Sequence, residues 1–196
     1  MELVQISRSK NKKKDVNVYI KTFGCSLNTS DSEAMAGILK NEGYDIVDSS
    51  EDADIIVINS CTVKNEAEAK FFKAIDEFKN KKIILAGCIA QANPDLANNR
   101  LKEYSIIGTS QLNNICSVVE KTVNGDRIVL LQKEHIPRLS LPSLRKNKLI
   151  EIIPINEGCL GNCTYCSTVL ARGKLFSYNP EAIIEKARQS VKEGIK

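Results

Sequence analysis

Short runs of β-branched apolar residues alternate with amphipathic stretches between residues 16 and 124. Such runs are typical of buried parallel strands, and the stretches between them have the spacing of helices that cover a sheet. The pattern therefore predicts an α/β fold with a doubly wound, Rossmann-like parallel sheet. The expected strands are 16–23, 44–47, 55–59, 83–87 and 104–107.

Turn and capping residues predict the helices between these strands. Ser30 and Glu33 have the spacing of a capping box at the start of the first helix, and Gly43 is expected to end it. The remaining helices are expected over about 66–79, from about Pro94 onward, and over 111–124.

The periodicity stops at residues 133–147, which contain two prolines and several basic side chains, and these residues are predicted to form a linker. The pattern then restarts with an expected strand over 148–155, a cysteine-rich loop, and a helix that begins at Pro180 and runs to about Glu193. The expected division is a basic flexible tail over 1–15, a domain over 16–132, the linker, and a further βα unit over 148–196.

The composition is that of a soluble globular chain, with 196 residues, 42% of them hydrophobic and 27% charged. No stretch reaches the roughly 18 consecutive apolar residues that span a bilayer, so we expect no membrane contact and a cytoplasmic location. The net charge is +3 for residues 1–15, −4 for 16–132 and +5 for 133–196. The basic ends are most simply a solvated tail and linker, and contact with a phosphate backbone is the alternative.

Seven cysteines in a reducing compartment favour metal ligation, catalysis or burial over disulfides. Cys159, Cys163 and Cys166 form a Cys-x3-Cys-x2-Cys triplet in a loop after a predicted strand. Three thiolates this close can hold three irons of a four-iron cluster and leave the fourth iron open, for instance to S-adenosylmethionine. A zinc site is the alternative, but the only histidine, His135, lies in the predicted linker at no ligand spacing.

Cys25, Cys61 and Cys88 lie 36 and 27 residues apart, but each comes just past the end of a predicted strand. Because the carboxyl ends of parallel strands face one crevice, we expect these thiols to converge on one site. Cys116 is different, since it shares helical spacing with apolar residues such as Val119, and it is predicted to be a core residue.

The Cys159–Cys166 loop, with Tyr165 before its last cysteine, resembles the radical-SAM signature. From residue 16 onward the chain resembles the radical-SAM methylthiotransferase family. The segments that carry this resemblance are Thr22-Phe23-Gly24-Cys25, Asn28, Asp31-Ser32-Glu33, Asn59-Ser60-Cys61-Thr62-Val63 and Ala86-Gly87-Cys88-Ile89-Ala90-Gln91.

The resemblance implies two 4Fe-4S clusters with different tasks. Cys159, Cys163 and Cys166 would bind the cluster that cleaves S-adenosylmethionine to a radical. Cys25, Cys61 and Cys88 would hold an auxiliary cluster that carries the sulfur to be inserted. A second S-adenosylmethionine would supply the methyl group, and the implied partners are tRNA, an external electron donor and a sulfur donor.

Members of this family differ in substrate: threonylcarbamoyladenosine or isopentenyladenosine beside the tRNA anticodon, or an aspartate of a ribosomal protein. The segment 59–64 resembles the archaeal and eukaryotic branch that acts at C2 of threonylcarbamoyladenosine. Family members also have a complete radical-SAM barrel, which needs roughly 200 residues or more. We therefore expect residues 148–196 to be the first βα unit of a truncated, TIM-like barrel, and this fragment alone to be inactive.

Two other classes of protein fit the cysteines. A non-enzymatic iron-sulfur module for electron transfer would show reversible redox behaviour and no response to S-adenosylmethionine. A zinc-dependent RNA-binding domain would contain zinc and no iron.

Overall fold

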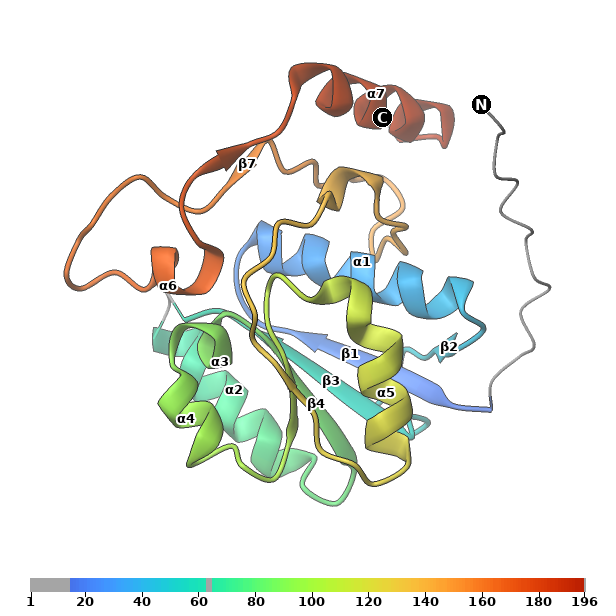
Figure 1. The fold of residues 1–196 in the computed structure, drawn as a ribbon. Coiled ribbons are helices and arrows are strands. Elements are labelled where there is room, and N and C mark those ends of the chain that lie inside the picture. Colours follow the sequence, from blue (N-terminus) through green and yellow to red (C-terminus); the bar gives the residue numbers. More distant parts are fainter. Residues whose placement is uncertain (1–14, 63–64, 196) are drawn as a thin grey trace, which may run out of the picture.

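The computed structural model of the chain describes residues 15–62 and 65–195. Within this range the largest element is a parallel sheet of six strands in the order β2-β1-β3-β4-β5-β6 (Figure 1). The predicted doubly wound α/β sheet is therefore confirmed, and β6 is an additional strand that the sequence pattern did not predict. The strands are β1 (Asn17–Thr22), β2 (Asp45–Ile46), β3 (Ile55–Ser60), β4 (Lys82–Gly87), β5 (Ser105–Ile107) and β6 (Val129–Leu130).

Helices cover both faces of this sheet (Figure 1). Helices α1 (Ser26–Asn41) and α5 (Ile115–Val123) pack on one face, and α2 (Asn65–Glu77), α3 (Cys88–Ala92) and α4 (Pro94–Asn98) on the other. The short 3-10 helix Leu112–Asn114 leads into α5. Cys116 packs against the apolar cluster under α1 and α5, as predicted.

Strand β3 shows why the sheet has two cores. All six of its residues are buried, as expected for a central parallel strand. Val57 contributes to the cluster on the α1 and α5 side, whereas Ile56 and Ile58 contribute to the cluster under α2 and α4. This alternation arises because successive side chains of a strand point to opposite faces of the sheet.

Helix α1 begins five residues earlier than the capping box predicts. Cys25 is its N-cap, in an extended conformation, so Ser30 and Glu33 lie inside the helix and the capping-box prediction was wrong. The positive φ of Gly24 (144°) turns the chain directly after β1 and lets the helix start at Ser26. Gly43, with φ of 88°, follows the end of the helix as predicted.

The expected strand over 148–155 was also wrong, because these residues have no pairing partner in the described part of the chain. A strand needs a neighbour to accept its backbone hydrogen bonds. Only the two-residue strands β7 (Asn156–Glu157) and β8 (Phe176–Ser177) pair here, and they are antiparallel. The elements that follow the cysteine loop are α6 (Thr168–Arg172) and α7 (Pro180–Lys192), and the latter begins at Pro180 as predicted.

Residues 133–147, the predicted linker, run along helix α1. The Leu144 amide donates to the Glu33 carbonyl oxygen at 2.9 Å, and Ile136 and Arg138 are buried, the latter in the 3-10 helix Arg138–Ser140. The predicted basic tail lies, apart from Asp15, outside the described residues. None of the described helices combines the length and apolarity that crossing a membrane requires.

Candidate metal centre

Cys25, Cys61 and Cys88 lie at the carboxyl edge of the parallel sheet. They follow β1, β3 and β4, and the parallel register aligns the carboxyl ends of these strands. The chain first places β2 on one side of β1 and then continues with β3 on the other side. The strand order therefore reverses between β1 and β3. Ligands of doubly wound folds bind at this switch point.

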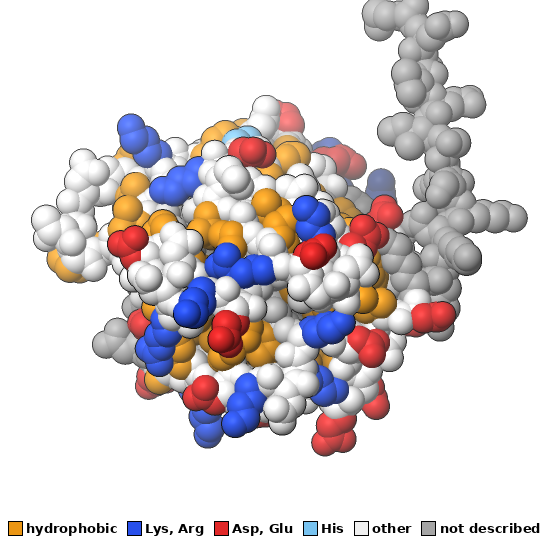
Figure 2. Space-filling view, turned by 60° about the horizontal axis from the view of Figure 1, so that its bottom comes forward, with side chains coloured by type: hydrophobic (Ala, Val, Ile, Leu, Met, Phe, Trp, Pro, Cys, Tyr) orange, Lys and Arg blue, Asp and Glu red, His pale blue; other side chains and the backbone are white. Residues whose placement is uncertain are grey.

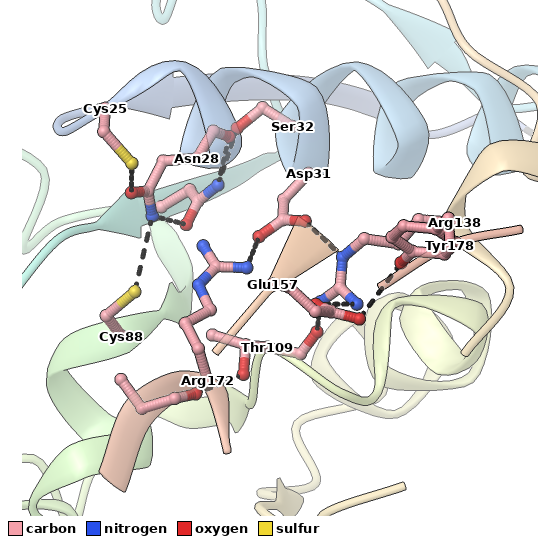
Figure 3. Close-up of polar contacts among 12 residues, drawn as sticks. Cys25, Asn28, Asp31, Ser32, Cys88, Thr109, Arg138, Glu157, Arg172 and Tyr178 are labelled. Atoms are coloured by element: carbon pink, nitrogen blue, oxygen red, sulfur yellow. Dashed lines mark hydrogen bonds and ion pairs between the residues drawn. The ribbon is translucent and has the colours of Figure 1, made fainter. Parts of the chain in front are cut away.

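The side chain of Asn28 contacts two of the cysteines and the residue before the third (Figure 3). Its Oδ1 accepts from the Cys25 thiol at 3.3 Å, and its Nδ2 lies 3.8 Å from Cys88 Sγ. The same Nδ2 donates at 3.0 Å to the carbonyl oxygen of Ser60, the residue before Cys61. Asn28 is fully buried, so one amide in the first turn of α1 contacts all three strand ends.

Two glycines allow this close approach. A Cβ on Gly24 would lie 2.7 Å from both Cys61 Cβ and Asn28 Oδ1, and a Cβ on Gly87 would lie 2.3 Å from Asn59 Oδ1. Both residues have positive φ, which L side chains rarely adopt. The residues before Cys25 and Cys88 must therefore be glycine for the loops to meet.

Cys61 and Cys88 are both buried, whereas Cys25 is exposed. Hydrogen bonding with Cys61, followed by burial, raises the pKa of the Cys88 thiol well above its ordinary value. The thiol is therefore neutral without a metal, and a metal would have to displace its proton. The exposed Cys25 leaves a route from solvent to this site.

The compact triplet lines a separate cavity of about 300 Å³. Gly161 lies next to two of the sulfurs. A Cβ added to Gly161 would lie 3.5 Å from Cys159 Sγ and 3.8 Å from Cys163 Sγ, so glycine leaves the space beside both sulfurs open. The cavity is lined by Cys159, Gly161, Asn162, Cys163, Thr164, Cys166, Val169 and Leu170.

Two sulfurs of this loop have hydrogen-bond partners. The Gly161 amide donates to Cys159 Sγ at 3.3 Å. Thr168 Oγ1 lies 3.1 Å from Cys166 Sγ, and hydrogen bonds with the Thr168 hydroxyl and then its amide lower the pKa of Cys166. Thiolates are the form in which cysteine binds metal, so Thr168 favours the ligand form of Cys166.

Backbone contacts fix the start of this loop. The Cys159 amide donates to the Gly173 carbonyl oxygen at 3.3 Å, and the Leu175 amide donates to the Cys159 carbonyl oxygen at 3.2 Å. A Cβ on Gly158 would lie 2.3 Å from the carbonyl oxygen of Lys174, so only glycine allows the two segments to lie this close. The loop is thereby tied to the residues that follow α6.

A buried network of charges connects the cysteine loop to the sheet edge (Figure 3). Asp31 in α1 binds Arg138 Nε at 3.0 Å with one carboxylate oxygen and Arg172 Nη1 at 2.5 Å with the other. Arg138 Nη1 also binds Glu157 at 2.6 Å, and Glu157 accepts from the Tyr178 hydroxyl at 3.0 Å. Burial and then Glu157 raise the pKa of Tyr178 to about 12, so it stays a donor.

The sequence analysis missed the roles of both arginines. Arg138 was expected in a solvated linker, and Arg172 was not considered at all. Their partner Asp31 lies 107 and 141 positions away, so no local spacing indicates the pairs. Burial opposes the charge of Arg172, but Asp31 and Cys88 raise its pKa above the ordinary value.

The sulfur atoms of the two cysteine sets are soft potential metal ligands. Among residues 15–62 and 65–195, no three His, Cys, Asp or Glu side chains are grouped closely enough to hold one metal ion. The two cysteine sets supply three soft ligands each, and the His135 ring lies against Phe176, 3.8 Å between ring centroids.

Charges on the face drawn in Figure 2 are mixed. Lysine and arginine side chains are interspersed with aspartate and glutamate, without a broad basic region on this face. This agrees with the net charge of −4 of residues 16–132.

Comparisons with known proteins give relatives along most of the chain. Residues 17–108 match the model described as "Uncharacterized protein family UPF0004". The chain is 48% identical over 187 residues to the threonylcarbamoyladenosine tRNA methylthiotransferases of Danio rerio and Homo sapiens, with 91% of this chain and 34% and 32% of theirs covered.

An archaeal relative extends the comparison. The probable threonylcarbamoyladenosine tRNA methylthiotransferase of Pyrococcus horikoshii is 39% identical over 186 residues, which are 92% of this chain and 43% of that protein. The chain thus spans between a third and just under half of the length of these relatives. Along nine-tenths of its length the chain is therefore similar to threonylcarbamoyladenosine tRNA methylthiotransferases of vertebrates and archaea.

Proposed function

We propose that the chain provides the iron-sulfur centres of a radical-SAM enzyme that adds a methylthio group to C2 of threonylcarbamoyladenosine in tRNA. The observation that carries the proposal is the pair of three-cysteine sets, one on the sheet edge and one in the loop before α6, joined by the ion pair of Asp31 and Arg172. The substrate follows the names of the relatives in vertebrates and archaea.

In this proposal each set holds a 4Fe-4S cluster with one iron free of protein ligands. Cys159, Cys163 and Cys166 would hold the cluster that binds S-adenosylmethionine, and Cys25, Cys61 and Cys88 the cluster that carries sulfur. The clusters supply one-electron chemistry and a sulfur atom for transfer. An external electron donor and a sulfur donor are the partners that this chemistry requires.

The task of the protein residues is to position the two sets and to prepare their thiols. The Gly161 amide binds Cys159 Sγ, and Thr168 favours the thiolate of Cys166. Asn28 orients Cys25 and Cys88 at the sheet edge. Asp31 and Arg172 connect α1 to α6, so the loop cannot move freely relative to the edge. Fixed geometry between reacting groups is a large part of what a protein contributes to such chemistry.

The test is nucleoside mass spectrometry of tRNA from cells that carry or lack the gene encoding the chain. Deletion should abolish the methylthio derivative of threonylcarbamoyladenosine and leave threonylcarbamoyladenosine itself. The wild-type gene should restore the product, as should a gene with Cys116→Ser, whereas Cys25→Ala or Cys163→Ala should not. An unchanged nucleoside profile after deletion would refute the proposed substrate, and loss of a methylthio derivative of isopentenyladenosine would assign another one.

A further inference from the structure

Arg172 has one buried nitrogen that contacts no acceptor. Its side chain is 6% exposed, and Nη1 binds Asp31. Nη2 is one of two buried side-chain nitrogen or oxygen atoms in the described residues that lack a hydrogen-bond partner; the other is Gln91 Oε1. A buried guanidinium donor without an acceptor is costly, so this nitrogen indicates a missing ligand.

The free nitrogen faces the cysteines of the sheet edge. In Figure 3 the guanidinium of Arg172 lies between Asp31 on one side and Asn28 and Cys88 on the other. Burial opposes the charge of Arg172, whereas Asp31 and Cys88, through their charges and through hydrogen bonds to the guanidinium, raise its pKa, so the Cys88 sulfur lies within reach of the guanidinium even though no hydrogen bond of good geometry reaches Nη2. Nη2 thus borders the site that Cys25, Cys61 and Cys88 surround.

The position of Arg172 is fixed by its surroundings. Asp31 holds Nη1, and the Ala171 carbonyl oxygen next to Arg172 accepts from the buried Thr109 hydroxyl at 2.6 Å. Helix α6 also packs against α3, the helix that begins at Cys88. The guanidinium therefore points to this site without needing a rearrangement of the backbone.

The ligand that fits this nitrogen is an anionic sulfur. The guanidinium is a permanent cation that donates most strongly to anions, and Asp31, its partner in the structure, is already shared with Arg138. The side chains labelled on the cysteine side of the guanidinium in Figure 3 end in sulfur, in an amide or in a hydroxyl, and none of them is a carboxylate. A sulfide or thiolate bound there would carry negative charge within reach of Nη2.

We propose that Arg172 donates a charge-assisted hydrogen bond from Nη2 to an anionic sulfur of the group held by Cys25, Cys61 and Cys88, and that Asp31 positions it for this contact. The inference rests on the proposed function, since it takes that group to be an iron-sulfur cluster. A hydrogen bond to cluster sulfur stabilises the more negative, reduced state and raises the reduction potential. Arg172 lies in α6, directly after Cys159, Cys163 and Cys166 in the sequence. It would nevertheless tune the reduction potential of the other cluster, the one held by Cys25, Cys61 and Cys88.

The experiment isolates the auxiliary cluster in a chain with Cys159→Ala, Cys163→Ala and Cys166→Ala. The protein is reconstituted anaerobically with iron and sulfide, and the midpoint potential is measured by a redox titration followed by electron paramagnetic resonance. In this background, Arg172→Gln should lower the ratio of reduced to oxidised cluster about tenfold at a fixed ambient potential. This corresponds to a decrease of ~59 mV in the midpoint potential for one electron. Arg172→Lys, which keeps the charge, should give a smaller shift in the same direction.

Arg138→Gln is the matched control. Arg138 also binds Asp31, but its other partners are Glu157 and the Thr109 carbonyl oxygen. A merely structural role for Arg172 predicts that both arginine variants shift the potential alike, whereas the proposal predicts that Arg138→Gln leaves it near the wild-type value.

The outcomes separate this inference from the proposed function. If the isolated site binds no iron in the presence of Arg172, the proposed function fails. If it binds iron fully and the Arg172→Gln and Arg172→Lys variants have the same potential as the chain that retains Arg172, the inference alone is overturned. The Arg172→Gln protein could also lose its iron. This would support the inference if its circular dichroism is unchanged and the Arg172→Lys protein keeps its iron.

Discussion

The carboxylate of Asp31 in α1 lies 2.5 Å from Nη1 of Arg172 in α6, across 141 positions of sequence. The pair is buried, with exposed fractions of 1% and 6%, and Asp31 binds a second buried arginine, Arg138, at the same time. One carboxylate therefore compensates two buried cations, and it connects the sheet edge to the helix after the cysteine loop.

Replacement of Asp31 by asparagine should strongly destabilise the chain, because it removes the carboxylate that pairs with the buried Arg172 and leaves Arg138 paired with Glu157 alone. We expect a loss of about 3–5 kcal/mol in the free energy of unfolding. Urea denaturation of the metal-free chain, followed by circular dichroism, measures it. Asp45→Asn is the control, since its pair with Lys40 is solvent-exposed and should contribute less than about 1 kcal/mol. Equal effects of the two variants would contradict the role given to Asp31.

Replacement of Asn28 by alanine should weaken the site at the sheet edge without affecting the loop site. Asn28 contacts Cys25 and Cys88 directly, and residues that orient metal ligands typically contribute about 10–100-fold to metal affinity, so we expect a loss of about this size. The effect is measured in two chains, each of which retains only one of the cysteine sets. The rate at which a chelator removes iron is followed by absorbance in each chain, with and without Asn28→Ala. Asn114→Ala, at a polar contact with Gln111 in another loop, is the control. Faster iron loss from the Cys159 set instead would show that Asn28 does not serve the sheet-edge site.

Gly37 should not tolerate alanine, although alanine is the better helix former. A Cβ there would lie 2.6 Å from the Pro142 carbonyl carbon and oxygen, so helix α1 and the crossing segment would have to separate. We expect a net loss of about 1–3 kcal/mol in the free energy of unfolding, against a propensity gain of up to about 1 kcal/mol. Chemical denaturation measures it, with Lys40→Ala on the solvent side of the same helix as control. Stabilisation by Gly37→Ala would show that residues 133–147 do not pack on α1.

Glu33 should make the fold less stable as the pH rises. Burial is the main cause of its raised pKa, and the hydrogen bond from the Lys146 amide opposes it only partly. The folded state therefore binds the proton of Glu33 more tightly than the unfolded state does. Its stabilising effect is complete below the unfolded pKa, about 4.3 for glutamate, and is lost as the pH rises through the higher folded pKa.

Glu33→Gln tests this dependence, because glutamine keeps an acceptor for the Lys146 amide and cannot ionise. We expect the variant to be more stable than wild type at pH 7 and similar to it near pH 4, from urea denaturation at each pH. Glu193→Gln should behave in the opposite way, since the hydrogen bond from Arg145 lowers the pKa of Glu193. A Glu33→Gln protein that is less stable at pH 7 would contradict the sign.

The sequence was sufficient to predict features with local signatures. Apolar runs of about four residues or longer indicated five of the strands, and the convergence of Cys25, Cys61 and Cys88 followed from parallel strand ends. Strand β6 lies in the apolar run 128–131, which was not predicted to be a strand, and only two of its residues pair with β5. The strand predicted over 148–155 needed a neighbour that the described residues lack.

The charge network could not be predicted in the same way. Asp31, Arg138 and Arg172 meet only after the segment 133–147 and helix α6 have packed on the sheet, and pairs so far apart leave no spacing in the sequence. Asn28 is intermediate: it was noted as part of the family resemblance, but its contacts with two cysteines emerge only from the turn at Gly24.

The central claim is that six cysteines form two separate iron-sulfur sites, and iron and sulfide analysis after anaerobic reconstitution tests it most directly. The wild-type chain and Cys116→Ser should bind about eight irons, and replacing either three-cysteine set by alanine should leave about four, bound by the other set. Zinc in place of iron, or loss of all iron when one set alone is removed, would contradict the account.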